Sequence, residues 1–212
     1  PLADGPTIQR SSEKAIQNGT NITNIIQTVK QIREKSEIPV ILMGYLNPVL
    51  KYGVEKFCRE AAEAGTDGLI IPDVPVGQFD ILQNQARKYG LSLIYLVAPN
   101  TPDERMREID KHSQGFVYCV SVTGVTGARR GNEVAASVKR FINRVNENIT
   151  KNSTMIGFGI KTHEDAQKIA EKAEGFIVGS ALIDTIDQHY PNDGWKEATF
   201  EFVKQLKYGL NH

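Results

Sequence analysis

Six short apolar segments alternate with segments of helical periodicity along this chain. Apolar runs of roughly four to eight residues, rich in β-branched side chains, are typical of strands buried on both faces of a parallel sheet. Strict alternation of such strands with helices predicts right-handed β–α–β crossovers in one α/β domain. A Tyr-Leu-Asn-Pro turn is expected at residues 45–48, after the first strand. The expected strands are residues 38–43, 68–71, 91–97, 116–120, 154–158 and 175–178.

The parallel sheet is either an open doubly wound sheet or part of a (β/α)8 barrel, and two features favour the barrel. The last two strands end in Gly159 and in Gly179-Ser180, and barrels commonly bind a phosphate after their seventh and eighth strands. The chain also opens within a loop, PLADGP, as if two strand–helix units preceded it. A doubly wound sheet would carry G-x-G-x-x-G after its first strand, and none occurs there. We therefore predict a (β/α)8 barrel whose first two strands and their helices are missing from these residues.

Composition and charge exclude several other classes of protein. The 212 residues are 40% hydrophobic and 24% charged, so we expect residues 1–212 to form one globular domain with a sizeable core. The 25 basic and 25 acidic residues balance, which gives no sign of nucleic-acid or membrane binding. No apolar run approaches the roughly 20 residues of a spanning helix. Cys58 and Cys119 are far apart without a CxxC, which favours a reducing, cytoplasmic compartment over a disulfide or zinc site.

Residues 116–131, FVYCVSVTGVTGARRG, change abruptly from a buried strand to a glycine-rich loop. Functional sites favour loops on a rigid scaffold, so this loop is predicted to lie over a bound group, with a flexible surface connection as the alternative. Gly127, Gly159 and Gly179 with Ser180 stand at the ends of the last three strands and would converge on one barrel face. Their N–H groups and the helix that follows favour an anion, although each glycine alone is equally suited to a tight turn.

Candidate acids and aromatic residues lie in loops and near the strand ends. Asp4, in a loop rich in proline and glycine, is either a proton acceptor that orients a substrate N–H or a solvated loop residue. Asp73, between two prolines, is either catalytic or fixes a turn. Tyr45, Tyr118 and Phe158 are candidates for an aromatic pocket wall, with core packing as the alternative. The four histidines show no ligand spacing, so neither a metal nor a Ser-His-Asp arrangement is expected.

Six separate motifs resemble the tryptophan synthase alpha subunit family. In order, they are PLADGPTIQ from Pro1, LMGYLNPV from Leu42, IIPDVPV from Ile70, SVTGVTGAR from Ser121, GFGI from Gly157 and IVGSAL from Ile177. The resemblance implies a (β/α)8 barrel without a cofactor. It also implies a lyase of tryptophan biosynthesis that cleaves indole-3-glycerol phosphate by a retro-aldol step to indole and glyceraldehyde 3-phosphate. A partner beta subunit, in an alpha2beta2 heterotetramer, would receive the indole through a tunnel, in the cytoplasm or the plastid stroma.

The resemblance also implies roles for individual residues. Asp4 would accept from the indole N–H and stabilise positive charge as C3 is protonated, and Thr126 would orient Asp4 when the loop closes and excludes water. Asp73 would then shape a turn. The phosphate would be bound by Gly127, Gly159, Gly179 and Ser180. The substrate pocket would be lined by Ile8, Met43, Tyr45, Ile70, Tyr118, Phe158 and Ile177, and the beta subunit would be faced by Asn47 and Pro75.

One residue that the resemblance implies falls outside the sequence. The family's general acid/base is a glutamate shortly before PLADGP, and this chain starts after it. The resemblance thus implies an open barrel without lyase activity for these residues alone, and we expect them to be a portion of a longer protein. Two alternatives remain: a non-catalytic, phosphate-binding subunit that activates a partner, and another phosphate-binding barrel such as a phosphoribosyl isomerase or indoleglycerol-phosphate synthase. Such other phosphate-binding barrels would be expected to carry Lys or Asp at the ends of the strands VILMGY and LIYLVA. No Lys occurs there, which argues against this alternative.

Overall fold

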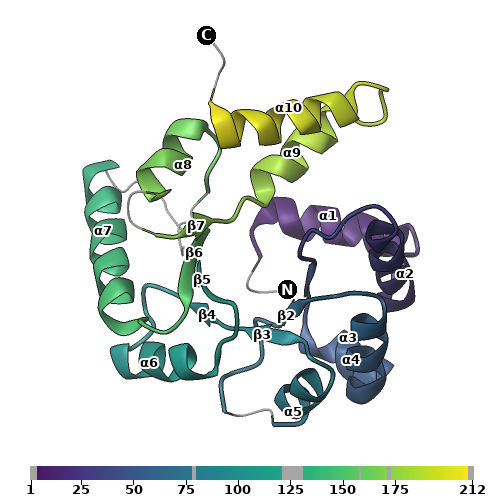
Figure 1. Ribbon diagram of the computed structural model, residues 1–212. Coiled ribbons are helices and arrows are strands. Elements are labelled where there is room, and N and C mark those ends of the chain that lie inside the picture. Colours follow the sequence, from purple (N-terminus) through teal and green to yellow (C-terminus); the bar gives the residue numbers. More distant parts are fainter. Residues whose placement is uncertain (1–3, 78–79, 121–130, 158, 171–172, 210–212) are drawn as a thin grey trace.

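The computed structural model describes residues 4–77, 80–120, 131–157, 159–170 and 173–209 (Figure 1). Helices and strands alternate along most of the chain. The strands are β1 (Ile41–Met43), β2 (Gly68–Ile70), β3 (Ser92–Ile94), β4 (Leu96–Val97), β5 (Phe116–Val120), β6 (Ser153–Gly157) and β7 (Gly175–Phe176). The helices are α1 (Pro6–Gln17), α2 (Ile22–Arg33), α3 (Leu46–Tyr52), α4 (Val54–Glu63), α5 (Asp80–Lys88), α6 (Asp103–His112), α7 (Gly131–Asn148), α8 (His163–Ala170), α9 (Ser180–His189) and α10 (Trp195–Tyr208).

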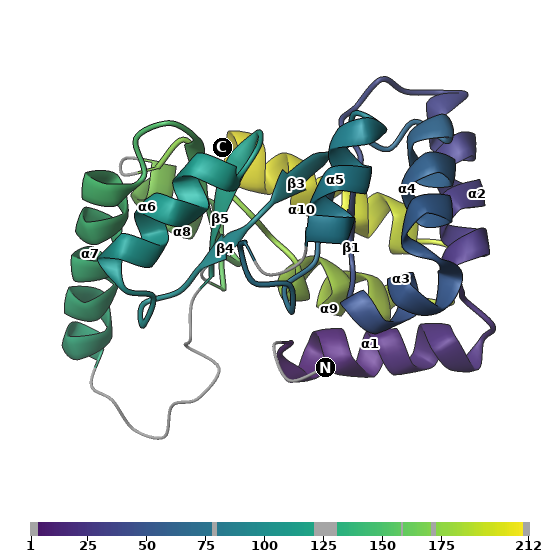
Figure 2. The ribbon, with the colours of Figure 1, turned by 90° about the horizontal axis from the view of Figure 1, so that it is seen from below.

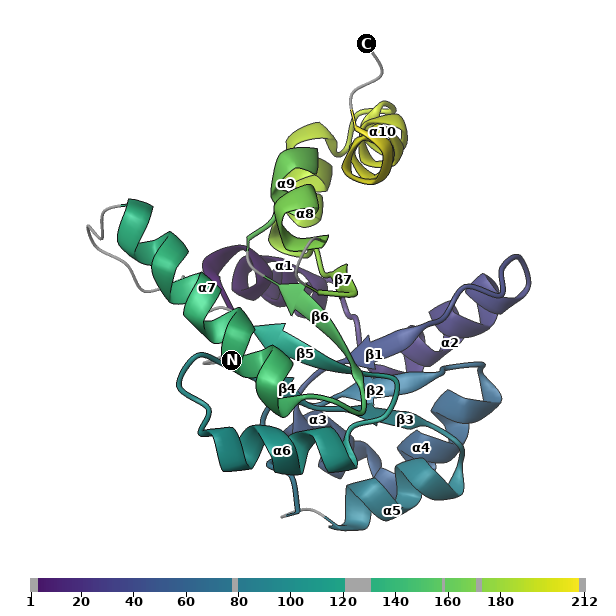
Figure 3. The ribbon, with the colours of Figure 1, turned by 60° about the vertical axis from the view of Figure 1, so that its left-hand side comes forward.

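Paired strands are all parallel, and they follow one another in the order of the sequence. β1 pairs with β2 and β2 with β3, while β4 pairs with β5, β5 with β6 and β6 with β7. A doubly wound sheet reverses its strand order at a switch point, whereas a barrel does not. Among the described strands the order never reverses, and helices lie outside them (Figures 1 and 3). The strand order therefore supports the predicted barrel over the doubly wound sheet.

The third predicted strand, residues 91–97, is two strands in the structure. Tyr95 separates β3 from β4 because its backbone N donates to Ser113 Oγ (3.1 Å) and not to a neighbouring strand. Its backbone O accepts from Tyr118 N (3.0 Å), which is the first hydrogen bond of the β4–β5 pairing. β3 consequently pairs with β2, and β4 pairs with β5. The prediction of one strand is wrong because the Ser113 side chain, from the connection before β5, takes the place of a strand partner. Nothing in the pattern of residues 91–97 indicates that.

Residues 45–48 do not form the predicted turn but lead into α3. Pro48 lies in the first turn of this helix, where a backbone N–H would have no partner within the helix to lose. Asp73 supplies a partner for the helix start, since its Oδ1 and Oδ2 accept from Leu46 N at 3.0 and 3.2 Å. Asp73 therefore ties the loop after β1 to the loop after β2, as a turn-shaping residue would.

The main core lies between the strands and the helices that cover them. Fully burying one large apolar side chain contributes roughly 1.5–3 kcal/mol, so these layers fix the strand ends in place. A smaller cluster of Ile160, Ala166 and Leu206 joins α8 to α10. Buried members of the main core include Leu69, Leu93, Val117 and Ile156 on the strands and Phe57, Leu82, Met106 and Phe141 on the helices.

Helices α1 and α9 lie side by side although they are far apart in the sequence (Figure 2). Thr7 Oγ1 donates to Asp184 Oδ1 (3.1 Å), and Arg10 Nη2 reaches the same oxygen at 3.4 Å. One turn further along, Lys14 Nζ lies 3.4 Å from Asp187 Oδ1. Because α1 precedes β1 and α9 follows β7, these contacts link the two ends of the strand order.

Candidate active site

Asp4 is held near the carboxyl end of β1. Its Oδ2 accepts a 2.7 Å hydrogen bond from the hydroxyl of Tyr45, which follows β1 and precedes α3. Its backbone O accepts from Gln9 Nε2 at 2.8 Å, which fixes the loop against the first turns of α1. The carboxylate is partly buried. The structure thus brings together two predicted site residues, Asp4 and Tyr45, whose contact the sequence does not indicate.

Tyr118, on β5, lies close enough to Asp4 to be affected by its charge. Burial raises the pKa of the Tyr118 hydroxyl, and the negative charge of Asp4 raises this pKa further, because both disfavour a phenolate. The hydroxyl therefore stays neutral near pH 7 and is able to donate a hydrogen bond. Asp4, Tyr45 and Tyr118, from three separate segments, form one polar and aromatic cluster at the carboxyl end of the strands.

Gly157, the last residue of β6, leaves room for the ring of Tyr118. A Cβ added to Gly157 would lie 2.7 Å from both Cε2 and Oη of Tyr118, closer than such atoms approach in proteins. Glycine inside a strand often marks a close approach of another group. Gly157 is therefore a residue of the site that the sequence prediction missed, although a glycine within the predicted strand 154–158 was the available signal.

We expect Gly157→Ala to displace the Tyr118 ring and to lower the free energy of unfolding by about 1–3 kcal/mol, the usual cost of overpacking. Gly44→Ala is the matched control, because a Cβ at Gly44 would have no atom within 4 Å. Urea unfolding of both variants measures the effect, and the control should show no loss. Equal losses in the two variants would mean that contact with Tyr118 is not the cause.

The start of α9 presents unpaired backbone N–H groups. Gly179 is the N-cap and Ser180 the first helical residue; both are exposed, and no side chain of the described residues caps this helix start. A Cβ at Gly179 would lie 3.8 Å from Ile8 Cδ1, so Ile8 on α1 borders the same position. Gly159, also exposed, follows β6 with φ +60°, a conformation that favours glycine. A helix N-terminus of this kind is suited to an anion.

The remaining predicted pocket residues lie on strand ends but differ in exposure. Met43 and Ile70 are neighbours in the register of β1 and β2. Ile70 is buried, whereas Met43 is 53% exposed. Ile177, directly after β7, is partly buried.

Two other groups of predicted site residues are those proposed to face a partner and those that lie outside the described residues. Asn47, in the first turn of α3, and Pro75, after β2, are both exposed, so each is available to a partner. Thr126, Gly127 and Phe158 lie outside the described residues, and so does most of the glycine-rich loop.

Three further features of the described part of the chain bear on metal, thiol and membrane sites. No group of three or more His, Cys, Asp or Glu side chains there could hold a metal ion. Burial raises the pKa of Cys58 to about 11 and that of Cys119 to about 12, so both remain protonated thiols at neutral pH. Among the described helices, none has the length and apolar character needed to cross a membrane.

The fold and the site define the class of protein: an α/β-barrel protein with its chemistry at the carboxyl ends of parallel strands. Comparison with known proteins then gives the family. A family profile described as tryptophan synthase alpha chain matches residues 1–210. The chain therefore belongs to the tryptophan synthase alpha chain family.

Individual relatives agree with the family match. The tryptophan synthase alpha chain of Christiangramia forsetii is 45% identical over 208 residues, which cover 98% of this chain and 78% of the relative. That of Methanocaldococcus jannaschii is 42% identical over 195 residues, covering 92% and 68%. The solved alpha subunit of Legionella pneumophila superposes with a TM-score of 0.84 at 37% identity, covering 99% of this chain and 77% of that one. A mutant alpha subunit from Pyrococcus furiosus gives a TM-score of 0.85 at 34% identity, covering 98% and 82%.

Family membership confirms the predicted fold class and function. The chain is a (β/α)8-barrel lyase of tryptophan biosynthesis, and the alpha reaction cleaves indole-3-glycerol phosphate to indole and glyceraldehyde 3-phosphate. The match decides against the other phosphate-binding barrels considered from the sequence. No finding favours the non-catalytic activator.

Proposed function

We propose that Asp4 is the residue of this chain that binds and activates the indole ring of indole-3-glycerol phosphate. The observation that carries the proposal is the 2.7 Å hydrogen bond from Tyr45 Oη to Asp4 Oδ2, beside the strand ends. This bond uses one carboxylate oxygen, and among the described residues no side chain bonds to the second, which is therefore suited to accept from an indole N–H. The residues proposed to line the substrate pocket around the ring are Ile8, Met43, Tyr45, Ile70 and Ile177, with Phe158 assigned from the sequence. Tyr118 is proposed to lie beside the glycerol phosphate.

The chemistry requires negative charge at this position. Protonation of the indole ring at C3 places positive charge on the ring, and cleavage of the carbon–carbon bond then returns an electron pair to the ring as the aldehyde leaves. A carboxylate beside the ring nitrogen stabilises this transient charge more than it stabilises the neutral substrate, so it lowers the barrier. The proton transfers need an additional acid/base group. That these residues alone lack lyase activity stays a prediction.

The phosphate, in this proposal, binds at the start of α9. Gly179 and Ser180 offer backbone N–H groups there, Gly159 lies after the neighbouring strand β6, and Gly127 is assigned to the same site from the sequence. Thr126 is assigned to orient Asp4 from the glycine-rich loop. The support is the uncapped N-terminus of α9 and the contact distance between Gly179 and Ile8, a residue proposed for the indole pocket.

The phosphate assignment is tested with Ser180→Asp. A like charge at this position should weaken binding of indole-3-glycerol phosphate by roughly tenfold or more, measured by calorimetric titration. The same change should leave stability unchanged or raise it by ~0.3–1 kcal/mol, because an acid at a helix N-terminus is favourable. Ser180→Asn, of nearly the same shape without the charge, is the control. Unchanged affinity in Ser180→Asp would move the phosphate elsewhere.

Family membership and a solved tryptophan synthase complex from Pyrococcus furiosus support a beta subunit as partner. We propose that Asn47 and Pro75 face that subunit in an alpha2beta2 assembly. Both are exposed, and the start of α3, which carries Asn47, is joined to the loop that carries Pro75 by the Asp73–Leu46 hydrogen bonds, which supports one common surface. We further propose one barrel domain for residues 1–212, a cytoplasmic location, and a reaction without a cofactor, a metal, nucleic acid or a membrane.

A further inference from the structure

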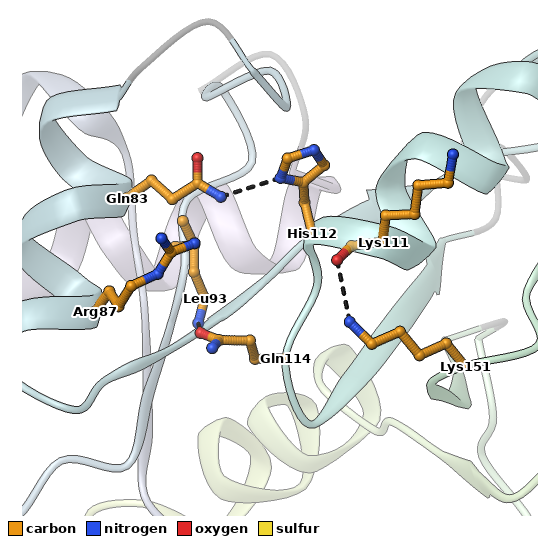
Figure 4. A pocket seen from close by; sticks show the side chains of 7 residues that line it. All are labelled: Gln83, Arg87, Leu93, Lys111, His112, Gln114 and Lys151. Atoms are coloured by element: carbon orange, nitrogen blue, oxygen red, sulfur yellow. Dashed lines mark hydrogen bonds between the residues drawn. The ribbon is translucent and has the colours of Figure 1, made fainter.

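A small cavity of about 150 Å³ lies at the amino ends of the strands, opposite the proposed active site. Gln83 and Arg87 reach it from α5, and Leu93 forms its floor on β3 (Figure 4). The end of α6 contributes Lys111 and His112 to the other wall. Gln114, before β5, and Lys151, before β6, complete the lining.

The cavity lies where β3 and β5, which belong to different sheets and are not paired with each other, face α5 and α6. Gln114 occupies the position between them: its Oε1 accepts from Leu93 N at 3.3 Å, and its backbone N donates to Leu93 O at 3.0 Å. Gly115, with φ +85°, turns the chain into β5 directly afterwards. A side chain and a turn fill less space than a strand, so a hollow remains between α5 and α6.

The lining is positively charged. Arg87, Lys111 and Lys151 are cations, His112 adds an imidazole, and none of the seven lining residues is acidic. Within the described residues the Arg87 guanidinium has no hydrogen-bonding or ion-pair partner, and Lys151 Nζ donates only to the backbone O of Lys111, at 3.1 Å. Figure 4 shows Arg87 and Lys151 reaching toward the centre from opposite sides, with the Lys111 ammonium turned away.

Neutral donors add to the same cavity. Gln83 Nε2 lies 3.2 Å from His112 Nδ1. An amide NH2 only donates, so Nδ1 is the acceptor and Nε2 of His112 carries the ring proton. The imidazole is thereby fixed as a donor on its other side.

The carboxylate of Asp110, which directly precedes Lys111 in α6, is occupied by other partners and does not neutralise these cations. Its oxygens accept from the backbone N–H groups of Thr150, Lys151 and Asn152 at 2.8, 2.9 and 3.0 Å, and from Asn152 Nδ2 at 3.0 Å. Burial acts to raise the pKa of Asp110, but these hydrogen bonds outweigh it and hold the pKa below its usual range. Asp110 thus fixes the turn that carries Lys151, and the hydrogen bonds of that turn already stabilise the negative charge of its carboxylate.

We propose that this cavity binds a tetrahedral oxyanion of phosphate size, either inorganic phosphate or the phosphoryl group of a small phosphomonoester. Size decides the class, since pockets for whole drug-sized ligands measure about 300–1,000 Å³ and this cavity is smaller. The cationic side chains of the lining favour a negatively charged ligand. A guanidinium binds a phosphate through paired N–H donors, and a lysine adds a point charge. The bound anion would connect α5, α6 and the turn before β6, and so would span the two separate sheets.

The test is a titration with inorganic phosphate, followed by the amide resonances of Leu93, Gln114 and Lys151. Saturable shifts are expected at these amides, beyond those caused by chloride at equal ionic strength. Arg87→Gln/Lys151→Gln should weaken the binding roughly tenfold or more, because two charge-assisted contacts are lost. Lys139→Gln/Arg140→Gln, which removes the same two kinds of charge from the exposed face of α7, should leave it unchanged.

Several outcomes would overturn the proposal: no shifts at the three amides, shifts reproduced by chloride, or equal shifts in the pocket variant. An equal effect in the α7 control would reduce the result to general charge screening. A parallel titration with glycerol 3-phosphate separates the two sources, since only an exposed phosphoryl site should accept the ester. Amides of Gly179 and Ser180 report the proposed substrate site in the same spectra, so either site can fail alone.

Discussion

Asp4→Asn is expected to lower the rate of indole release from indole-3-glycerol phosphate by roughly 100- to 10,000-fold. An asparagine carbonyl is still able to accept from the indole N–H and from Tyr45, so the geometry is retained. The neutral amide no longer stabilises positive charge on the protonated ring, so the loss falls on the chemical step. Turnover is measured on the full-length polypeptide together with the beta subunit, because residues 1–212 alone are predicted to lack lyase activity. The dissociation constant of the substrate is measured separately by calorimetry.

The binding measurement keeps the two effects apart. We expect the dissociation constant to change by less than roughly tenfold, the worth of one hydrogen bond. Asp193→Asn is the charge-matched control: Asp193 is exposed in the connection between α9 and α10, outside the α1–α9 contacts, so neither turnover nor binding should change. Substantial turnover by Asp4→Asn, with its unfolding curve intact, would remove Asp4 from the proposed role.

Asp110→Ala should lower the free energy of unfolding by about 3 kcal/mol, the largest stability loss expected here, because it leaves three backbone N–H groups without their acceptor. The aspartate is 5% exposed and joins α6 to the turn before β6. For a chain of this length the corresponding drop in Tm is about 6–12 °C. Urea and thermal unfolding measure both quantities.

The pH dependence gives Asp110 a second signature. Its pKa in the folded protein is below the ordinary value, since the hydrogen bonds from Asn152, Thr150 and Lys151 outweigh the opposing effect of burial. The contribution of the ionised Asp110 carboxylate to the free energy of unfolding is therefore fully present above the unfolded-state pKa of about 3.9. This contribution is lost as the pH falls through the lower pKa of the folded protein. The difference between the parent and Asp110→Ala should shrink at acid pH. Asp103→Ala, on the same helix and 49% exposed, should cost about 1 kcal/mol or less; an equal loss there would contradict the assignment.

The general fold follows from the sequence because apolar periodicity reports burial along each segment. The alternation predicted parallel strands, and the observed strand order within the described residues has no reversal. Two details depended on residues elsewhere in the chain. Ser113 divides the strand at Tyr95, and Asp73 receives the first N–H of α3. Hydrogen bonds between segments leave no mark in the local pattern, so neither detail was predictable.

The site was predicted in its residue types more than in its contacts. The motifs singled out Asp4, Tyr45 and Tyr118, but the hydrogen bond between Asp4 and Tyr45 spans 41 positions and needed the fold. Gly157 was missed because it lies inside the predicted strand 154–158 and was given no role of its own, whereas its lack of a side chain accommodates an aromatic ring. The roles of all these residues stay predictions, and Thr126, Gly127 and Phe158 also lie outside the described residues.

The attachment of α1 to α9 makes the two halves of the proposed substrate site interdependent. The side chains of Arg10 and Asp184 are 57% and 41% exposed, so dissolved ions are able to screen the attraction between them. A high salt concentration should accordingly weaken the contacts between α1, which follows Asp4, and α9, whose N-cap is Gly179. A ligand that binds beside one of these helices also stabilises the position of the other. Binding of the substrate's phosphate is therefore expected to strengthen binding of its indole ring.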